Sequence, residues 1–89
     1  METTTSTTVT VRYFAAARAA AGVETEPIEL PAGATITDAL ATVRERHGAD
    51  LARVLERCSF LLDEVAVRDR SVPLSDGATL DVLPPFAGG

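Results

Sequence analysis

The residues with the clearest chemical meaning form the end of the sequence: Pro84, Pro85, Phe86, Ala87, Gly88 and Gly89. Two prolines favour an extended chain, Phe86 offers an apolar anchor, and glycines without a Cβ atom fit a narrow channel. The reactive group of such a tail is the α-carboxylate of Gly89. At ~3.3 Å per residue the tail spans roughly 20 Å, enough to enter another protein's active site. A frayed end that happens to be glycine is the competing interpretation.

The size and composition of the chain indicate what kind of protein carries this tail. Eighty-nine residues correspond to one domain, which leaves little room for an enclosed substrate pocket. The composition is 46% hydrophobic and 24% charged, which indicates a compact core and argues against disorder over most of the length. We therefore expect a carrier, adaptor or subunit rather than a self-sufficient enzyme.

The charge and the apolar pattern restrict the partners. Thirteen acidic and eight basic residues give a net charge of -5, which excludes nucleic acid as a partner and favours a protein with a basic face. No apolar run approaches the ~20 residues of a membrane span, and no signal peptide is recognisable. The single Cys58 excludes an internal disulfide. We expect a cytoplasmic protein without a membrane partner.

The hydrophobic pattern divides the chain into a flexible lead-in at residues 1–8, a domain at 9–83 and an extended Gly-Gly tail at 84–89. The domain opens with alternation, in which one face of the first strand carries Val9, Val11 and Tyr13. A short alanine-rich helix at 15–22 follows. The next strand belongs at a sheet edge, because Pro27 cannot donate to a second neighbour.

The main helix is expected at residues 35–48. One face of it is apolar at the i, i+3, i+4, i+7 spacing, with Ile36, Ala39, Leu40 and Val43. Thr35 and Asp38 match a capping box, and Gly48 marks the stop. A second amphipathic segment at 50–58 continues the helical layer.

Three further strands are expected, at residues 60–62, 65–67 and 78–83. Asp63-Glu64 and Asp76-Gly77 supply the turns between them. The prediction is an α+β fold, with a mixed sheet of four to five strands packed on one main helix plus short helices.

Three segments carry a resemblance to a known family: "VTVRYFAAAR", "LPAGATITDAL" and "PLSDGATLDVLPPFAGG". Together they resemble the MoaD/ThiS family of sulfur carriers, and in particular its branch of molybdopterin synthase small subunits. The resemblance covers residues 9–89 and implies a ubiquitin-like β-grasp fold. Thiamine-pathway carriers share the Gly-Gly end, whereas the proline pair before Phe-Ala-Gly-Gly favours the molybdenum branch.

The resemblance also implies a mechanism. A ubiquitin-activating-like adenylyltransferase uses ATP to adenylate the Gly89 carboxylate, and sulfur from a donor protein then replaces AMP to give a thiocarboxylate. Adenylation is needed because a carboxylate is a poor acyl donor until one oxygen becomes a leaving group. The tail, from Pro84 to Gly89, inserts into a large synthase subunit, whose residues act on a pyranopterin. This chain itself is expected to hold no catalytic side chain, no permanent cofactor and no metal.

The family also implies an apolar patch that docks on both partners, formed here by Phe14, Val67 and Leu83. The alternation of side chains along a strand supports this for Phe14 and Leu83. It places both residues on the face of the sheet opposite to the core candidates Val11 and Val82.

Other polar or reactive residues have structural interpretations. Cys58 is expected to be packed, and His47 is expected to interact with the end of its helix. Asp63, Glu64 and Asp76 are expected to serve turn geometry.

Three alternative functions stay open on the sequence alone. They are a carrier for thiamine or for cysteine synthesis, a ubiquitin-like modifier joined to lysines of other proteins through Gly89, and a structural adaptor.

Overall fold

The first strand determines which face of the sheet is buried. In the computed structural model, which describes residues 6–85, its buried side chains alternate: Thr7, Val9, Val11 and Tyr13. The strand begins at Ser6 rather than at the predicted Val9, because Thr7 and Thr8 pair with Leu30 and Glu29 of the neighbouring strand. The part of the predicted lead-in that can be described is therefore strand, and residues 1–5 lie outside the described range.

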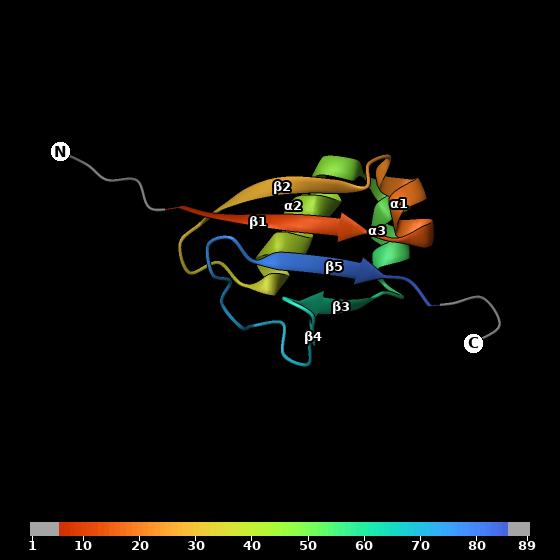
Figure 1. Ribbon diagram of the computed structural model, residues 1–89. Coiled ribbons are helices and arrows are strands. Elements are labelled where there is room, and N and C mark those ends of the chain that lie inside the picture. The colour runs from red at the N-terminus through yellow and green to blue at the C-terminus, as the bar shows by residue number, and fades with distance from the viewer. Residues whose placement is uncertain (1–5, 86–89) are drawn as a thin grey trace.

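The elements follow the predicted order (Figure 1). They are β1 (Ser6–Tyr13), α1 (Ala15–Ala21), β2 (Thr25–Pro31), α2 (Ile36–His47), α3 (Ala49–Leu55), β3 (Ser59–Leu62), β4 (Val65–Ala66) and β5 (Thr79–Leu83). Within residues 6–85 the strands form one five-stranded sheet with the order β2-β1-β5-β3-β4. The β1–β5 pair is parallel and the other pairs are antiparallel. The predicted mixed sheet and the edge position of β2 are confirmed.

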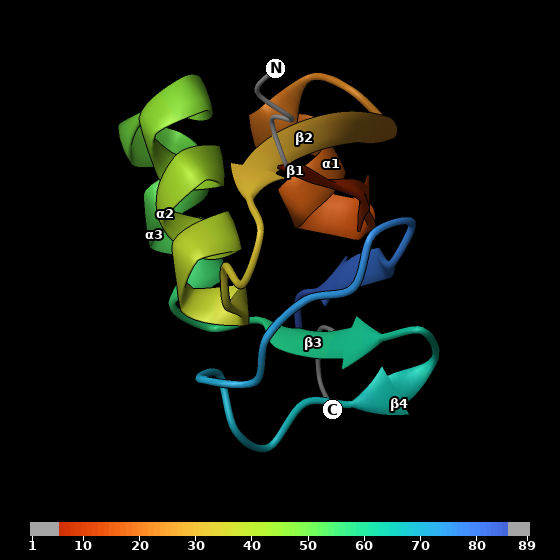
Figure 2. The same cartoon turned by 90° about the vertical axis from the view of Figure 1, so that its left-hand side faces the viewer.

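The helices α2 and α3 lie against one face of the sheet and leave the other face uncovered (Figure 2). The predicted apolar stripe of α2 is buried, and the capping box of Thr35 and Asp38 is present. The loop after β4 supplies further acceptors, because the Ile36 N–H donates to the Val72 carbonyl at 3.3 Å and the Thr37 N–H to the Arg70 carbonyl at 3.0 Å. The helix start is therefore fixed by a segment more than thirty residues away.

Two acidic residues at the predicted turns, Asp63 and Asp76, accept hydrogen bonds from backbone N–H groups. The Thr79 N–H donates to Asp63 Oδ1 and the Thr8 N–H donates to Asp76 Oδ1, both at 2.9 Å. Asp63 and Glu64 both have positive φ, at 48° and 72°, which is the conformation of a two-residue hairpin turn. The structural interpretation of these acids is confirmed.

Candidate functional site: the uncovered sheet face at the base of the tail

The tail leaves the domain from the middle of the sheet. Leu83 ends β5, which is paired on one side with β1 and on the other with β3. Pro84 is half-buried and Pro85 is exposed. The base of the tail is thus held by two neighbouring strands. The predicted tail residues Phe86, Ala87, Gly88 and Gly89 lie outside the described range.

Phe14 lies beside the end of β5, as its N–H donates to the Val82 carbonyl at 3.2 Å. It has extended backbone angles, so it continues the alternation of β1 and shares the face of Arg12. Its side chain is 39% exposed. By the same alternation, half-buried Leu83 lies on the face opposite buried Val82. The structure therefore places Phe14 and Leu83 at the same end of the uncovered face.

Val67 does not join this patch. Its N–H donates to the Phe60 carbonyl at 2.9 Å, and Phe60 pairs with core residue Val82 in the register of β3 and β5. Opposite residues in a sheet share a face, so Val67 lies on the helix side, where it packs against the core. The expectation that Phe14, Val67 and Leu83 form one surface is wrong for Val67, because the residue belongs to the other parity.

An ion pair occupies the uncovered face next to Phe14. Arg12 donates to Asp81 through Nε at 2.6 Å and through Nη2 at 2.8 Å, and Asp81 is only 4% exposed. The Arg12 guanidinium also lies over the Phe14 ring, 5.8 Å from its centroid. The hydrogen bond and charge of Asp81 raise the pKa of Arg12. The pair was not anticipated, because its recognition requires the parallel register that sets Arg12 opposite Asp81.

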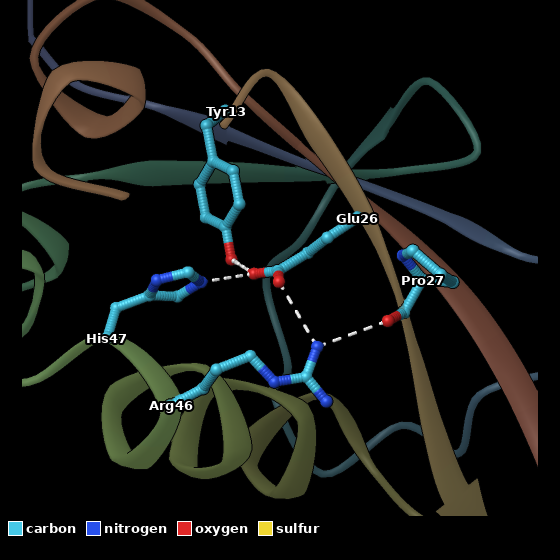
Figure 3. A network of polar contacts seen from close by, with 5 residues as sticks. All are labelled: Tyr13, Glu26, Pro27, Arg46 and His47. Atoms are coloured by element: carbon cyan, nitrogen blue, oxygen red, sulfur yellow. Dashed lines mark hydrogen bonds and ion pairs between the residues drawn. The ribbon is translucent and has the colours of Figure 1, made fainter. Parts of the chain in front are cut away.

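A second polar cluster lies on the helix side of β1 and centres on Glu26 (Figure 3). Its Oε2 atom accepts a hydrogen bond from the Tyr13 hydroxyl and contacts His47 Nε2, both at 2.5 Å. Its Oε1 atom accepts from Arg46 Nη1 at 3.1 Å, and Arg46 also donates to the Pro27 carbonyl at 3.2 Å. The cluster ties β1, β2 and the end of α2 together.

The cluster has a defined protonation. Burial alone raises the pKa of Glu26, but the hydrogen bonds from Tyr13, His47 and Arg46 outweigh it and lower that pKa below the ordinary value. Burial, followed by the hydrogen bond to Glu26, raises the pKa of Tyr13 well above its usual value. An ionised carboxylate only accepts hydrogen bonds, so Nε2 of His47 carries the proton. His47 therefore binds Glu26, and the cap of its helix is the Gly48 N–H, which donates to the Arg44 carbonyl.

Neither polar cluster has the arrangement of a catalytic centre. Every oxygen of Glu26 is occupied by donors from its own chain. Within residues 6–85, no three His, Cys, Asp or Glu residues gather as metal ligands would. The Cys58 thiol is buried, its Sγ lies 3.2 Å from the Val54 carbonyl oxygen, and burial raises its pKa. Packing, as predicted for Cys58, accounts for this residue.

The helices in the described part of the chain are all too short or too polar to cross a membrane.

The sheet order, the parallel central pair and the single long capped helix define a ubiquitin-like β-grasp domain of α+β architecture. The chain also matches the ThiS family over residues 11–89, so it belongs to that family. It is 38% identical over 82 residues to the molybdopterin synthase sulfur carrier subunit of Chlamydomonas reinhardtii, with 91% of this chain and 98% of the relative covered.

Solved structures share the fold over nearly their whole length. SAMP1 from Haloferax volcanii has a TM-score of 0.82 and 25% identity, with 92% of this chain and 99% of that chain covered. A chain of the complex of subunits 1 and 2 of the molybdopterin-converting factor from Helicobacter pylori has a TM-score of 0.68 and 27% identity. The coverage there is again 92% of this chain and 99% of that one.

Proposed function

We propose that this protein is a sulfur carrier for molybdopterin synthesis. The observation that carries the proposal is the 38% identity to a molybdopterin synthase sulfur carrier subunit, which extends over 98% of that relative. Membership of the ThiS family supports a sulfur carrier in general. The sequence ends in Gly88-Gly89 after a proline pair, which suits a carboxylate delivered into a partner's active site.

The carrier cycle has three chemical steps at Gly89. An adenylyltransferase joins the α-carboxylate to the AMP part of ATP and releases pyrophosphate. The persulfide of a donor protein then attacks the carbonyl carbon and AMP leaves, which gives an acyl disulfide between Gly89 and the donor. A thiol cleaves its S–S bond and forms a disulfide with the donor cysteine, so that the C-terminal thiocarboxylate is released. Its sulfur passes to a pyranopterin in the large synthase subunit, which supplies the catalytic side chains. This chain supplies the handle and the tail and holds no cofactor.

The handle is the uncovered sheet end with Phe14 and Leu83. An exposed aromatic beside a guanidinium held by Asp81 is the type of surface that dominates protein interfaces. Pro84 and Pro85 begin the tail at this surface, so docking and insertion of Phe86, Ala87 and Gly88 are coupled. The large subunit is the natural occupant, since a relative of this fold was solved in complex with its second subunit.

The direct test is intact mass spectrometry after incubation with the adenylyltransferase, ATP and a sulfur donor. Exchange of one carboxylate oxygen for sulfur adds about 16 Da. A chain without Gly89 should show no gain. An unchanged mass in the full chain, with an activating enzyme proven on its own carrier, would contradict the proposal.

Docking is tested with two variants at equally exposed positions. Phe14→Ala and Val23→Ala remove side chains that are 39% and 40% exposed. Loss of an interface aromatic is expected to weaken binding to the large subunit about tenfold or more, whereas Val23→Ala should bind like the parent chain. Equal binding by both variants would place the interface elsewhere.

A second candidate function is a ubiquitin-like protein modifier, favoured by the likeness to SAMP1. Here Gly89 would form an amide with a lysine of a target. All eight basic residues of this chain are arginines, so it holds no lysine on which chains of itself could grow. The modifier predicts conjugates of one added unit per lysine in cell extracts, whereas the carrier predicts the free chain and its thiocarboxylate.

A further inference from the structure

Four side chains form a square at one end of the uncovered sheet face. Arg12 lies opposite Asp81 in the parallel register of β1 and β5. Phe14 comes two residues after Arg12 and therefore shares its face. Leu83 has the same relation to Asp81. One row of the square is thus charged and the next row is apolar, and Arg12 links the two rows because its guanidinium lies over the Phe14 ring.

The backbone of Phe14 is fixed on both sides. Its N–H donates to the Val82 carbonyl at 3.2 Å, and its carbonyl accepts from the Ala17 N–H at 3.0 Å. The chain turns from strand to helix at Ala15, which has a positive φ of 51°. The side-chain torsions are therefore the main freedom left to Phe14.

The packing around Phe14 leaves its ring room for other rotamers. The side chain is 39% exposed. A hollow of about 330 Å³ borders it, and the lining of this hollow includes Arg18, Glu24 and Thr25. A mobile side chain loses rotamer freedom when a partner orders it, and this loss weakens binding. An aromatic anchor that already occupies its bound rotamer avoids the loss.

Arg12 can supply the missing restraint because it is itself fixed. It donates to Asp81 through Nε at 2.6 Å and through Nη2 at 2.8 Å, and two parallel bonds set the plane of the guanidinium as well as its position. Asp81 is only 4% exposed, so the pair is anchored within the sheet. The guanidinium carbon lies 5.8 Å from the centroid of the Phe14 ring, within the ~6 Å of a cation–π contact.

We propose that Arg12 is a positioning residue, which Asp81 holds over the Phe14 ring so that the ring keeps one rotamer before the large subunit binds. The inference rests on the docking surface of the proposed function and adds how its aromatic anchor is prepared. Arg12 acts through Phe14 in this arrangement. Arg18 borders the same hollow but has no comparable anchor, because its partner Glu24 lies at 3.4 Å and both side chains are well exposed.

The first measurement concerns the free chain and does not involve the large subunit. Three-bond NMR couplings to the Cγ atom of Phe14 report the populations of its χ1 rotamers. The chain has three phenylalanines and no tryptophan, which simplifies the assignment. The parent chain should show one dominant rotamer, and Arg12→Met should show averaged couplings.

Two further variants make this measurement specific to the Arg12–Asp81 pair. Asp81→Asn offers one acceptor oxygen in place of two, so the guanidinium plane is no longer fixed and the Phe14 couplings should again be averaged. Arg53→Met is the matched control, because it removes an arginine from an exposed ion pair on α3. Its Phe14 couplings should equal those of the parent chain.

The second measurement is the affinity for the large subunit by isothermal titration calorimetry, arranged as a double-mutant cycle. Arg12→Met should weaken binding about three- to fivefold, the range of an exposed cation–π contact. Phe14→Leu removes the ring and keeps an apolar side chain. In the presence of Phe14→Leu, the change Arg12→Met should alter the affinity less than about 1.5-fold, because its target is gone.

The two measurements separate this proposal from the proposed function. Averaged couplings in the parent chain, or unchanged couplings in Arg12→Met, would overturn it. So would an equal loss of affinity from Arg12→Met with and without Phe14→Leu, since Arg12 would then not act through the ring. A parent chain that does not bind the large subunit contradicts the proposed function, and the couplings still decide whether Arg12 holds the ring. If circular dichroism shows that Arg12→Met is unfolded, Arg12→Lys takes its place, because lysine keeps the charge but lacks the planar fork.

Discussion

Two neighbouring residues of β1 show how the polar contacts on the two faces of the sheet differ. Tyr13 points into the helix side and Arg12 points to the uncovered side, and each side chain donates to a carboxylate. The Tyr13 partner, Glu26, also receives His47 and Arg46, and its side chain is 12% exposed. The Arg12 partner, Asp81, is deeply buried, although the Arg12 side chain is 42% exposed.

The difference concerns unused hydrogen-bonding capacity. The Glu26 cluster is closed, since donors from α2 and β1 occupy both carboxylate oxygens. In the Arg12–Asp81 pair, two of the five guanidinium N–H donors are bonded within residues 6–85, and the partly exposed guanidinium lies over the Phe14 ring. A closed cluster holds elements of the fold together, whereas the open pair lies at the surface that we propose for docking. The two carboxylates should therefore respond differently to substitution.

The largest effect is expected from Glu26→Ala, which leaves the buried Tyr13 hydroxyl and the His47 ring without their acceptor. Each stranded polar group costs about 1–3 kcal/mol, so a loss of ~2–3 kcal/mol in the free energy of unfolding is expected. Glu29→Ala, at an exposed position of the same strand, should change it by less than about 0.5 kcal/mol. Urea denaturation of both variants measures the difference, and equal midpoints would show that the cluster contributes nothing.

A smaller loss is expected from Arg12→Met. Asp81 then loses both donors, but water can reach it from the open face, so the cost should be ~1–2 kcal/mol. Arg18→Met breaks an ion pair in which both side chains are well exposed and should cost at most about 0.5 kcal/mol. Thermal and urea unfolding provide the comparison. If Arg12→Met lost more free energy of unfolding than Glu26→Ala, the description of the Glu26 cluster as closed and of the Arg12–Asp81 pair as open would be wrong.

The smallest effect at neutral pH is expected from Tyr13→Phe, about 1 kcal/mol, because Glu26 keeps its other two donors. The pH dependence is more informative. Tyr13 has a raised pKa in the folded state, so its contribution is complete below the unfolded pKa of about 10 and is lost as pH rises further. Tyr13→Phe should lack this alkaline loss.

The measurement is the free energy of unfolding between about pH 8 and pH 11. The chain has one tyrosine and no lysine, which leaves few other groups to titrate in this range. The Cys58 thiol, whose pKa burial raises, contributes to both proteins alike, so the difference between them isolates Tyr13. Parallel pH profiles would mean that the hydroxyl is not held by Glu26.

Local patterns predicted much of this fold. The capping box of Thr35 and Asp38 and the alternation of β1 depend on residues close in sequence, and both are confirmed. The Asp63-Glu64 turn was recognised for the same reason. Backbone preferences act over a few residues, so they are visible before any tertiary contact is known.

The polar pairs could not be predicted in this way, because their members are distant in sequence. Arg12 meets Asp81 across 69 positions, and His47 meets Glu26 across 21. Both contacts depend on the register of strands and on where α2 ends. The face on which Val67 lies could not be predicted for a related reason. The two-residue turn at Asp63-Glu64 sets the register of β4 against β3, and this register decides which face of the sheet each following side chain occupies.

The position of β5 has a mechanical consequence. Its hydrogen bonds to β1 and β3 run across the strand, and Pro84 follows directly on its last residue, Leu83. A pull on the tail therefore loads these bonds in shear, all together, and does not peel them off singly as a pull on an edge strand would. A carrier drawn out of a tight channel by its tail should resist that force without unfolding.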